Sequence, residues 1–348
     1  MKFFWKIALS FCILIVVAYS LPVVLNPAEK IHQQPGFPNP EASSTDAEKG
    51  YPLPVTGYEF YIGQPIEAYT AKHGEPLRKG TAYGGSEWWT FGDTAQDFIQ
   101  VGVKDGVIRS LFILGDRIDT GMFTIGMNRD NILDEGYLAK DFHLSVGKQE
   151  YALEVTDQQQ MLTPLLQFEN DSFLMLLFDV QTQTVYGMYF LSNEALMDME
   201  YYPVSSDKKY EVKKQEWLRD AASDAENALQ IKAALAVMRT HHGVEPLQAN
   251  EELQAVADQI IPRNEEINDF TAKFALSEQR ISNKISELLP DKTVYFLFNE
   301  PFYDVPQLFI AMMQDEKIYP FLQDERIKNS AVACNRQYHL IVFGGQPE

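Results

Sequence analysis

The stretch Asn227–Ile261, NALQIKAALAVMRTHHGVEPLQANEELQAVADQII, decides the fold, because it predicts two amphipathic helices joined by a short connection. In the first helix, Ile231, Leu235 and Met238 recur at helical spacing and form one apolar face. Gly243 is expected to end this helix, since glycine tolerates the positive φ that a helix C-terminus often requires.

The second helix carries its own start and stop signals. Asn250 is a good N-cap, and Glu251 and Glu252 place negative charge in the first turn. Pro262 ends the helix. Its apolar face is formed by Leu253, Val256, Ala257 and Ile260. The sequence therefore bounds this helix at both ends.

The same stretch contains Met238-Arg239, the run Gly243–Leu247 and Asn250. In this order these residues resemble the opening of a CAP domain, found in cysteine-rich secretory proteins, antigen 5 and pathogenesis-related proteins. The resemblance implies a later helix over Val305–Leu322 and closing strands over Asn329–Gly344.

Ahead of this region, one structural unit is predicted to occur twice. Phe60-Tyr-Ile-Gly63 opens the first copy and Phe123-Thr-Ile-Gly126 the second, and each is followed by a short predicted helix and then by strands. The predicted helices are Pro65–His73 and Arg129–Tyr137. The paired strands are Trp88–Phe91 with Tyr151–Val155, Phe98–Val103 with Phe173–Phe178, and Val107–Leu114 with Thr184–Leu191.

Each copy is predicted to end in a β-hairpin. Lys104-Asp-Gly106 is the first turn, and Asp-Gly is a strong hairpin signal; Gln181-Thr-Gln183 is a weaker one. The two copies are expected to bury their apolar faces against each other. This order, with Gly74-Glu-Pro76 after the first helix, resembles the CAP-associated N-terminal domain that precedes CAP domains in many Gram-positive bacteria.

The predicted fold class is α+β, with a duplicated helix-plus-antiparallel-sheet N-terminal module followed by a CAP-like α-β-α sandwich. The predicted divisions are a membrane anchor or signal segment (1–26), a Pro-rich disordered tether (27–57), the CAP-associated N-terminal domain (58–198, with repeats at about 58–120 and 121–198), a connector (199–225) and a degenerate CAP-like domain (226–346).

Composition excludes some partners. The 348 residues include 49 acidic and 29 basic residues, which gives a net charge of −20. This charge argues against nucleic-acid binding and against electrostatic docking on anionic lipid.

Cys12 and Cys334 are the two cysteines, and Cys12 lies in the N-terminal apolar run, so no disulfide within a domain is expected. Cys334 is predicted to be a buried structural thiol.

The N-terminus is predicted to reach the membrane. Lys2 and Lys6 precede the uncharged run Ile7–Leu25, and about 18–20 apolar residues suffice to cross a bilayer as a helix. The basic flank is expected to stay in the cytoplasm, which places the rest outside. Ala18-Tyr-Ser20 leaves cleavage by signal peptidase, and hence secretion, as the alternative. The Pro-rich stretch Pro27–Pro54 is expected to be an extended tether.

The resemblance implies a central groove in which two His and two Glu can bind a metal. The stretches where the histidines would lie, Arg263–Phe274 and Met312–Tyr319, contain none, and Ile318 stands at about the second position. Glu300 is a possible remnant of the glutamates. The prediction is therefore no catalytic residue, no metal ligand and no cofactor.

The tryptophans, the remaining histidines of interest and Cys334 are expected to have structural roles. Of Trp88 and Trp89, one is expected in the core and one half-buried at the surface, because neighbouring strand residues face opposite ways. His241 and His242 diverge by about 100° on a helix, so they are not expected to hold one ligand together. His339 is expected to be half exposed on a strand. Cys334 is not expected to be a nucleophile.

The predicted function is a non-enzymatic, membrane-tethered, extracytoplasmic CAP-family module. It would bind an envelope protein, glycan or lipid through the groove between its two domains, without nucleic acid, and touch the membrane through its N-terminal segment alone. One alternative is a metal-dependent hydrolase with an altered groove site. The other is a lipid-binding protein, with Tyr295–Phe298 and Phe302–Phe309 lining the cavity.

Overall fold

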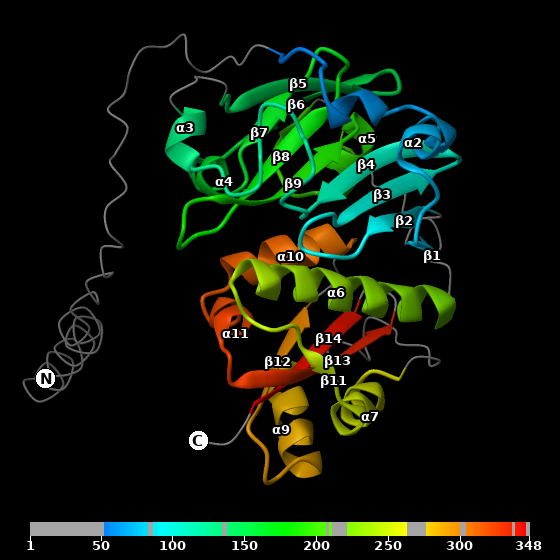
Figure 1. Ribbon diagram of the computed structural model, residues 1–348. Coiled ribbons are helices and arrows are strands. Elements are labelled where there is room, and N and C mark those ends of the chain that lie inside the picture. Colours follow the sequence, from blue (N-terminus) through cyan, green and yellow to red (C-terminus); the bar gives the residue numbers. More distant parts are fainter. Residues whose placement is uncertain are drawn as a thin grey trace, which may run out of the picture. The chain divides into compact units, whose positions relative to one another are not determined.

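A seven-stranded antiparallel sheet forms the N-terminal module, which we define as residues 52–206 (Figure 1). The computed structural model describes residues 52–82, 86–133, 138–206, 209–210, 221–262, 276–299, 304–335 and 338–345. All of them belong to the unit Ala47–Glu348. The strands, in spatial order, are β1 (Arg78–Thr81), β2 (Glu87–Gly92), β3 (Ile99–Lys104), β4 (Val107–Ile113), β9 (Val185–Leu191), β8 (Phe173–Phe178) and β7 (Leu165–Gln167).

Strands β8 and β9 have no charged residue because both faces of the sheet are covered there. Every residue of β8 and of β9 is buried. One face packs on the helices η1 (Tyr58–Tyr61), α2 (Ile66–His73) and α3 (Arg129–Leu133), through residues such as Tyr69 and Ile132. Side chains of the other face, including Phe112 and Tyr189, join a core that continues into the C-terminal part. Neither face of the sheet is therefore open to solvent at β8 and β9.

A smaller sheet, two further helices and the connector complete the N-terminal module. The three-stranded sheet has the order β10 (Val204–Ser205), β6 (Gln149–Glu154) and β5 (Asp141–Val146). The helices are α4 (Asp157–Leu162), which a Thr156 capping box begins, and α5 (Asn193–Asp198).

The C-terminal part, which we call the C-terminal sandwich (residues 221–345), is a four-stranded sheet between helices. The sheet has the order β11 (Gln248–Ala249), β13 (Ile327–Asn335), β14 (Tyr338–Gly345) and β12 (Val294–Asn299). The helices are α6 (Ala221–His241), α7 (Glu251–Ile260), α9 (Glu278–Leu288), α10 (Val305–Gln314) and α11 (Tyr319–Gln323). In Figure 1, α6 and α10 lie between this sheet and the N-terminal module.

The two faces of the C-terminal sheet join different cores. Ile341 and Phe343 belong to the core that includes α6, α10 and α11, whereas Leu340 and Val342 pack with α7 and α9. This alternation follows from the period of two along a strand. The α-β-α sandwich predicted from the sequence is confirmed, and so is the α+β fold class.

Several local predictions are confirmed. Gly243 has a φ of +73° after α6, and the Asn250 side chain accepts a hydrogen bond from Leu253 N at 3.0 Å at the start of α7. Asp105 and Gly106 both have positive φ, 53° and 74°, in the turn between β3 and β4. Two such residues are typical of the type I′ hairpin turn that Asp-Gly favours.

The predicted pairing of the repeats is wrong in two respects. Tyr151–Val155 is not the counterpart of Trp88–Phe91, because β6 pairs with β5 and β10 in the smaller sheet, while β7 is the strand that pairs with β8. The halves also do not stack face to face. They join edge to edge, since β4 pairs with β9 from Ser110↔Leu191 to Ile113↔Met188.

The helix predicted over Val305–Leu322 is two helices. Asp315, with φ −87° and ψ 111°, leaves the helical region at the end of α10. Pro320 stands in the first turn of α11, where the N–H that proline lacks has no intrahelical partner. The sequence therefore breaks the helix between these two residues.

The N-terminal apolar run Ile7–Leu25 and the tether Pro27–Pro54, except its last three residues, lie outside the described residues. Within the described part of the chain, no helix is both long enough and apolar enough to cross a bilayer.

One buried arginine connects four segments of the C-terminal sandwich. Arg239 has no exposed surface, and its guanidinium donates hydrogen bonds to five backbone carbonyls. The acceptors are Glu245 O at 2.9 Å, Phe321 O at 2.9 Å, Leu322 O at 3.5 Å, Asp324 O at 3.3 Å and Ile327 O at 3.0 Å. These carbonyls belong to the connection after α6, to α11, to the turn that follows it and to β13, so one side chain fixes their relative positions.

We expect Arg239→Lys to lower the free energy of unfolding by roughly 3 kcal/mol or more. Lysine has three donors on one nitrogen and cannot reach all five carbonyls, and each buried polar group left without a partner costs about 1–3 kcal/mol. Urea unfolding followed by far-UV circular dichroism measures the change. The control is Arg280→Lys on the exposed surface of α9. Equal stability of the two variants would contradict the assigned role.

Candidate functional site

The N-terminal module and the C-terminal sandwich meet along α10, α11 and α6. Gln307 Nε2 donates to Met199 O at 2.7 Å, and Gln314 Nε2 donates to Tyr201 OH at 3.1 Å. At the far side of the contact, His241 Nε2 lies 2.8 Å from Leu114 O. The apolar side chains between these polar contacts form one core shared by the two parts. The contact is therefore filled by side chains rather than open.

An ion pair and a close approach add to this contact at its β1 end. Arg78 of β1 pairs with Glu226 of α6, and a Cβ added to Gly80 would lie only 1.9 Å from Glu226 Cγ. The absence of a side chain at position 80 therefore lets β1 approach α6.

A part-buried hydroxyl–carboxyl pair lies at the start of α10. Tyr189 OH donates to Asp304 Oδ2 at 2.6 Å, and Asp304 Oδ1 accepts from Gln307 N at 2.8 Å as the N-cap of α10. Burial raises the pKa of Asp304 to about 6, while the hydrogen bonds from Tyr189 and from the Gln307 backbone oppose this rise. Burial also raises the pKa of Tyr189 well above its ordinary value.

A second polar cluster lies at α11. Asp179, in the turn after β8, is 3% exposed and accepts hydrogen bonds from Tyr319 OH, from Gln181 N at 2.8 Å and from Thr182 N at 2.9 Å. His242 Nε2 lies 3.8 Å from Asp179 Oδ2. Burial lowers the pKa of His242, and the nearby Asp179 charge opposes this shift. The cluster holds the turn after β8 against the end of α6 and against α11.

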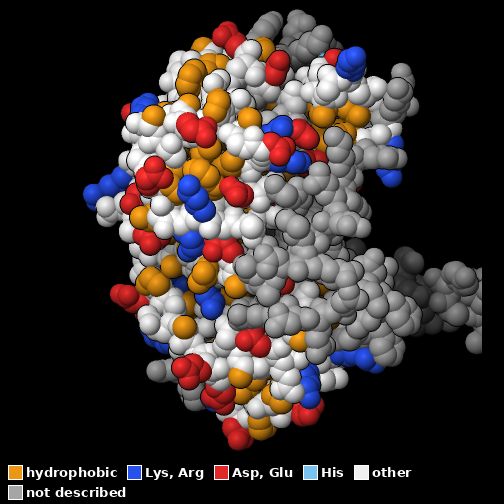
Figure 2. Space-filling view, turned by 90° about the vertical axis from the view of Figure 1, so that its right-hand side faces the viewer, with side chains coloured by type: hydrophobic (Ala, Val, Ile, Leu, Met, Phe, Trp, Pro, Cys, Tyr) orange, Lys and Arg blue, Asp and Glu red, His pale blue; other side chains and the backbone are white. Residues whose placement is uncertain are grey.

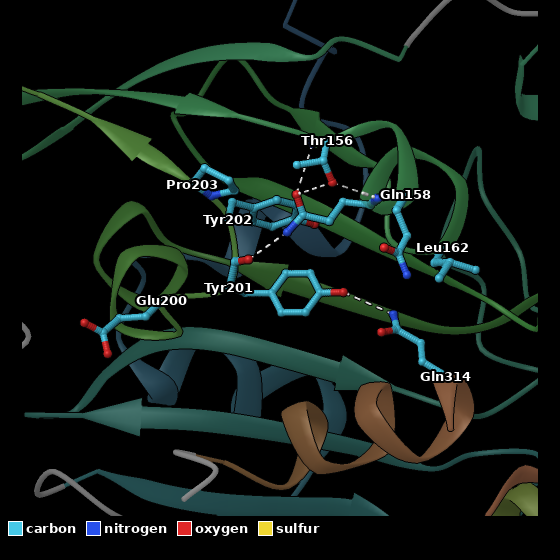
Figure 3. Close-up of a pocket in the computed structure, with 9 residues that line it drawn as sticks. Thr156, Gln158, Leu162, Glu200, Tyr201, Tyr202, Pro203 and Gln314 are labelled. Atoms are coloured by element: carbon cyan, nitrogen blue, oxygen red, sulfur yellow. Dashed lines mark hydrogen bonds between the residues drawn. The ribbon is translucent and has the colours of Figure 1, made fainter. Parts of the chain in front are cut away.

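A pocket of about 460 Å³ lies where α4, the connector and the end of α10 come together (Figure 3). We call it the junction pocket. This volume falls within the range of small-molecule sites, about 300–1,000 Å³. The lining residues are Thr156, Gln158, Gln159, Leu162, Glu200, Tyr201, Tyr202, Pro203 and Gln314. The N-terminal module and the connector supply eight of these nine residues, and the C-terminal sandwich supplies Gln314.

Tyr201 occupies the centre of the junction pocket. Its hydroxyl lies 3.1 Å from Thr163 Oγ1 and accepts the Gln314 bond, and its carbonyl accepts from Gln159 Nε2 at 2.7 Å. Its ring meets the Tyr202 ring edge to face, with centroids 5.0 Å apart. Figure 3 shows the Tyr201 ring between α4 and α10. Tyr201 is therefore held by both parts of the protein.

The chemistry of the junction pocket is that of hydrogen bonding. Its polar groups are three glutamine amides, a threonine and two tyrosine hydroxyls, and the Glu200 carboxylate, which points away from Tyr201 in Figure 3. Amides and hydroxyls both donate and accept hydrogen bonds. Elsewhere in the described part of the chain, no group of three or more His, Cys, Asp or Glu side chains is placed to hold a metal ion.

Comparison with known proteins identifies the N-terminal module. Residues 62–202 match the family model described as CAP-associated N-terminal. This segment is a CAP-associated N-terminal domain.

Solved structures show the fold of the whole described chain. A cysteine-rich secretory protein from Staphylococcus aureus superposes with a TM-score of 0.74 at 20% identity, over 85% of this chain and 95% of that one. An extracellular protein containing an SCP domain, from Bacillus anthracis, gives a TM-score of 0.68 at 18% identity, over 89% and 100% of the two chains. The predicted combination of a CAP-associated N-terminal domain with a CAP-like fold is confirmed.

A relative from Bacillus subtilis is named as an uncharacterized membrane protein, YlbC. It is 21% identical over 218 residues, which cover 57% of this chain and 60% of the relative. The match thus spans less than two thirds of the length of that relative.

The tryptophans of the CAP-associated domain lie as predicted. Trp88 is 5% exposed in the core shared with the sandwich, and Trp89 is partly buried on the opposite face of the sheet. Lys79 Nζ stands 3.7 Å from the centroid of the Trp89 ring, and Trp89 Nε1 donates to Glu87 Oε2 at 2.8 Å. Both tryptophans therefore have structural contacts.

For the histidines of the CAP-like sandwich, one prediction is confirmed and one is wrong. His241 contacts Leu114 O while His242 lies near Asp179, so the two diverge as predicted. His339 was expected to be half exposed, but it is 3% exposed, because helices cover both faces of the sheet. Cys334 is buried, directly opposite His339 in the β13–β14 pair.

The groove positions implied by the CAP resemblance are only partly described. Glu300 and Arg263–Phe274 lie outside the described residues. Ile318, at about the place of the second histidine, is buried in the core shared with the CAP-associated domain. Tyr319, next to it, bonds Asp179 of that domain.

The stretches considered for a lipid cavity take part in packing. Tyr295 is 37% exposed, with its ring centroid 4.4 Å from that of Phe321. The described part of the second stretch, Val305–Phe309, is buried in the common core. Core packing therefore accounts for these side chains.

Sequence reasoning missed the junction pocket. Its lining comes from Thr156–Leu162, from Glu200–Pro203 and from Gln314, which are far apart in the chain. The sequence does show a run of three glutamines, Gln158–Gln160, beside a capping residue, but such a run has no characteristic spacing. Only the docking of α10 on the connector brings these groups together.

The Tyr189–Asp304 pair predicts a pH dependence of stability. The pKa of Asp304 is about 6 in the folded chain and about 3.9 when unfolded, so the folded chain binds more protons between these values. The stability that the protonated group contributes is complete below about pH 4 and is lost as the pH rises through about 6. The loss is on the order of 3 kcal/mol, at 1.36 kcal/mol per pKa unit.

Asp304→Asn keeps an N-cap acceptor but removes this titration. We expect the stability of the variant relative to the wild type to rise by about 1–3 kcal/mol between pH 4 and pH 7. Urea unfolding across this range measures the difference, with exposed Asp291→Asn as the control. A flat difference would show that Asp304 ionises normally.

Proposed function

We propose that the protein is a non-enzymatic, membrane-associated binding protein that recognises a component of the bacterial cell envelope through the junction pocket. The observation that carries this proposal is the pocket itself. It lies where the CAP-associated domain meets the CAP-like sandwich, and its lining offers amides, hydroxyls and an aromatic ring from the first and the Gln314 amide from the second. Ligand sites occur preferentially where domains meet.

The compartment in this proposal rests on the N-terminus and on the relatives. Lys2 and Lys6 flank the apolar run on the side expected to stay in the cytoplasm, which supports an extracytoplasmic position for the folded residues. The similar Bacillus subtilis protein is named a membrane protein, and the similar Bacillus anthracis protein is named extracellular. An envelope component is the class of ligand that a tethered domain on this side of the membrane meets first.

The surface charge agrees with a ligand recognised by shape and hydrogen bonds. On the face drawn in Figure 2, acidic and basic side chains alternate with small apolar areas among the coloured residues. The net charge of −20 opposes the binding of an anionic polymer. The pocket groups are then the natural source of specificity.

A pelleting experiment tests this function. The purified full-length chain, in a detergent without a sugar head group, is mixed with isolated Bacillus subtilis cell walls and centrifuged. We expect the chain to co-sediment. The double substitution Gln158→Ala and Gln314→Ala should weaken binding about tenfold, because two hydrogen bonds of about 0.5–1.5 kcal/mol each are lost.

Gln160→Ala is the matched control, since Gln160 lies on α4 but does not line the pocket. It should bind the walls as the wild type does. Thermal melting shows that all variants are folded. The proposal is wrong if the wild-type chain stays in the supernatant, or if the double variant pellets as well as the wild type.

A further inference from the structure

The junction pocket has no cationic side chain among its nine lining residues. Its one carboxylate, on Glu200, is exposed and points away from Tyr201 (Figure 3). Anionic ligands such as phosphates and carboxylates are typically held by Arg or Lys, through charge-assisted hydrogen bonds. In a chain with a net charge of −20, a pocket without such groups disfavours an anion. The lining therefore favours an uncharged ligand over an anionic one.

Three backbone groups beside the junction pocket already have partners. Tyr201 O accepts from Gln159 Nε2, and Pro203 O accepts from Glu154 N at 3.0 Å. Glu200 N donates to Met197 O at 3.2 Å, and Pro203 has no N–H. Peptide segments that add to a protein as strands need free main-chain donors and acceptors. These backbone groups are therefore not available to a ligand, and recognition in this pocket falls to the side chains.

The side chains that remain available are amides beside a ring. Gln158 is exposed, and its side chain makes no hydrogen bond within the described part of the chain. Gln314 uses its Nε2 on Tyr201, which leaves Oε1 as an acceptor that faces the pocket. Leu162 and the Tyr201 ring supply apolar surface between these amides.

This combination matches one ligand chemistry. Each sugar hydroxyl both donates and accepts hydrogen bonds, as a glutamine amide does through its two ends. The C–H face of a sugar ring is apolar and flat, and an aromatic side chain offers a rigid surface of the same kind. We propose that the junction pocket binds an uncharged saccharide of the envelope, a proposal that rests on the function proposed above.

Competition in the pelleting experiment tests the ligand class. The same cell walls are digested enzymatically, and the soluble products are separated by ion exchange into uncharged oligosaccharides, charged oligosaccharides and peptides. Each pool is added to the full-length chain bound to intact walls. We expect the uncharged pool to release the chain, and to do so at a concentration about tenfold lower than the charged pool.

The pocket variants test whether the uncharged oligosaccharides bind in the junction pocket. Titration calorimetry with the uncharged pool should show binding to the wild type and to Gln160→Ala, and about tenfold weaker binding to the Gln158→Ala and Gln314→Ala double variant. Release by the charged pool or by the peptides alone overturns the saccharide proposal. Equal binding of the uncharged pool by the double variant overturns it too.

The outcomes separate this proposal from the function on which it rests. If the chain binds walls through the pocket but no uncharged oligosaccharide releases it, the saccharide proposal fails and the binding function stands. If the chain does not bind walls at all, the proposed function fails, and the ligand class fails with it.

Discussion

The guanidinium of Arg239 is the interaction on which the C-terminal sandwich depends. It is fully buried and donates hydrogen bonds to five backbone carbonyls from four segments. Burial lowers the pKa of Arg239, and the nearby Asp324 charge opposes this shift. By holding α11 and the turn after it against the end of α6, this side chain sets where α10 and α11 present their outer faces.

The position of α10 and α11 determines how the CAP-associated domain docks. The seven-stranded sheet of this domain is apolar on both faces, so the face that the short helices leave open must be covered by another part of the chain. Helices α6, α10 and α11 provide that cover. The polar contacts Tyr189–Asp304, which is part-buried, and Tyr319–Asp179, which is buried, then fix the register of the contact, since buried polar groups need partners.

The junction pocket is a consequence of this docking. At the C-terminal end of α10 the helix meets the connector and α4, and Tyr201 fills the centre between them. Since Tyr201 hydrogen-bonds both parts, a ligand that touches it also touches the contact between the domains. Ile318, at about the position that the CAP resemblance implies for the second histidine, lies in the common core.

The sequence by itself determined the elements whose signals are local. The caps at Asn250 and Gly243, the Asp105-Gly106 turn and the apolar periods of α6 and α7 follow from the backbone preferences of single residues and from helical spacing. The resemblance to CAP proteins rested on the same stretch. These features require no knowledge of what packs against them.

The tertiary structure alone decided which strands pair and which polar groups meet. The sequence could not show that β4 pairs with β9, because the register of distant strands depends on which faces become buried. For the same reason His339 is buried although its strand pattern predicted partial exposure. The junction pocket joins residues from 156 to 314, and their proximity arises only when the two domains share one core.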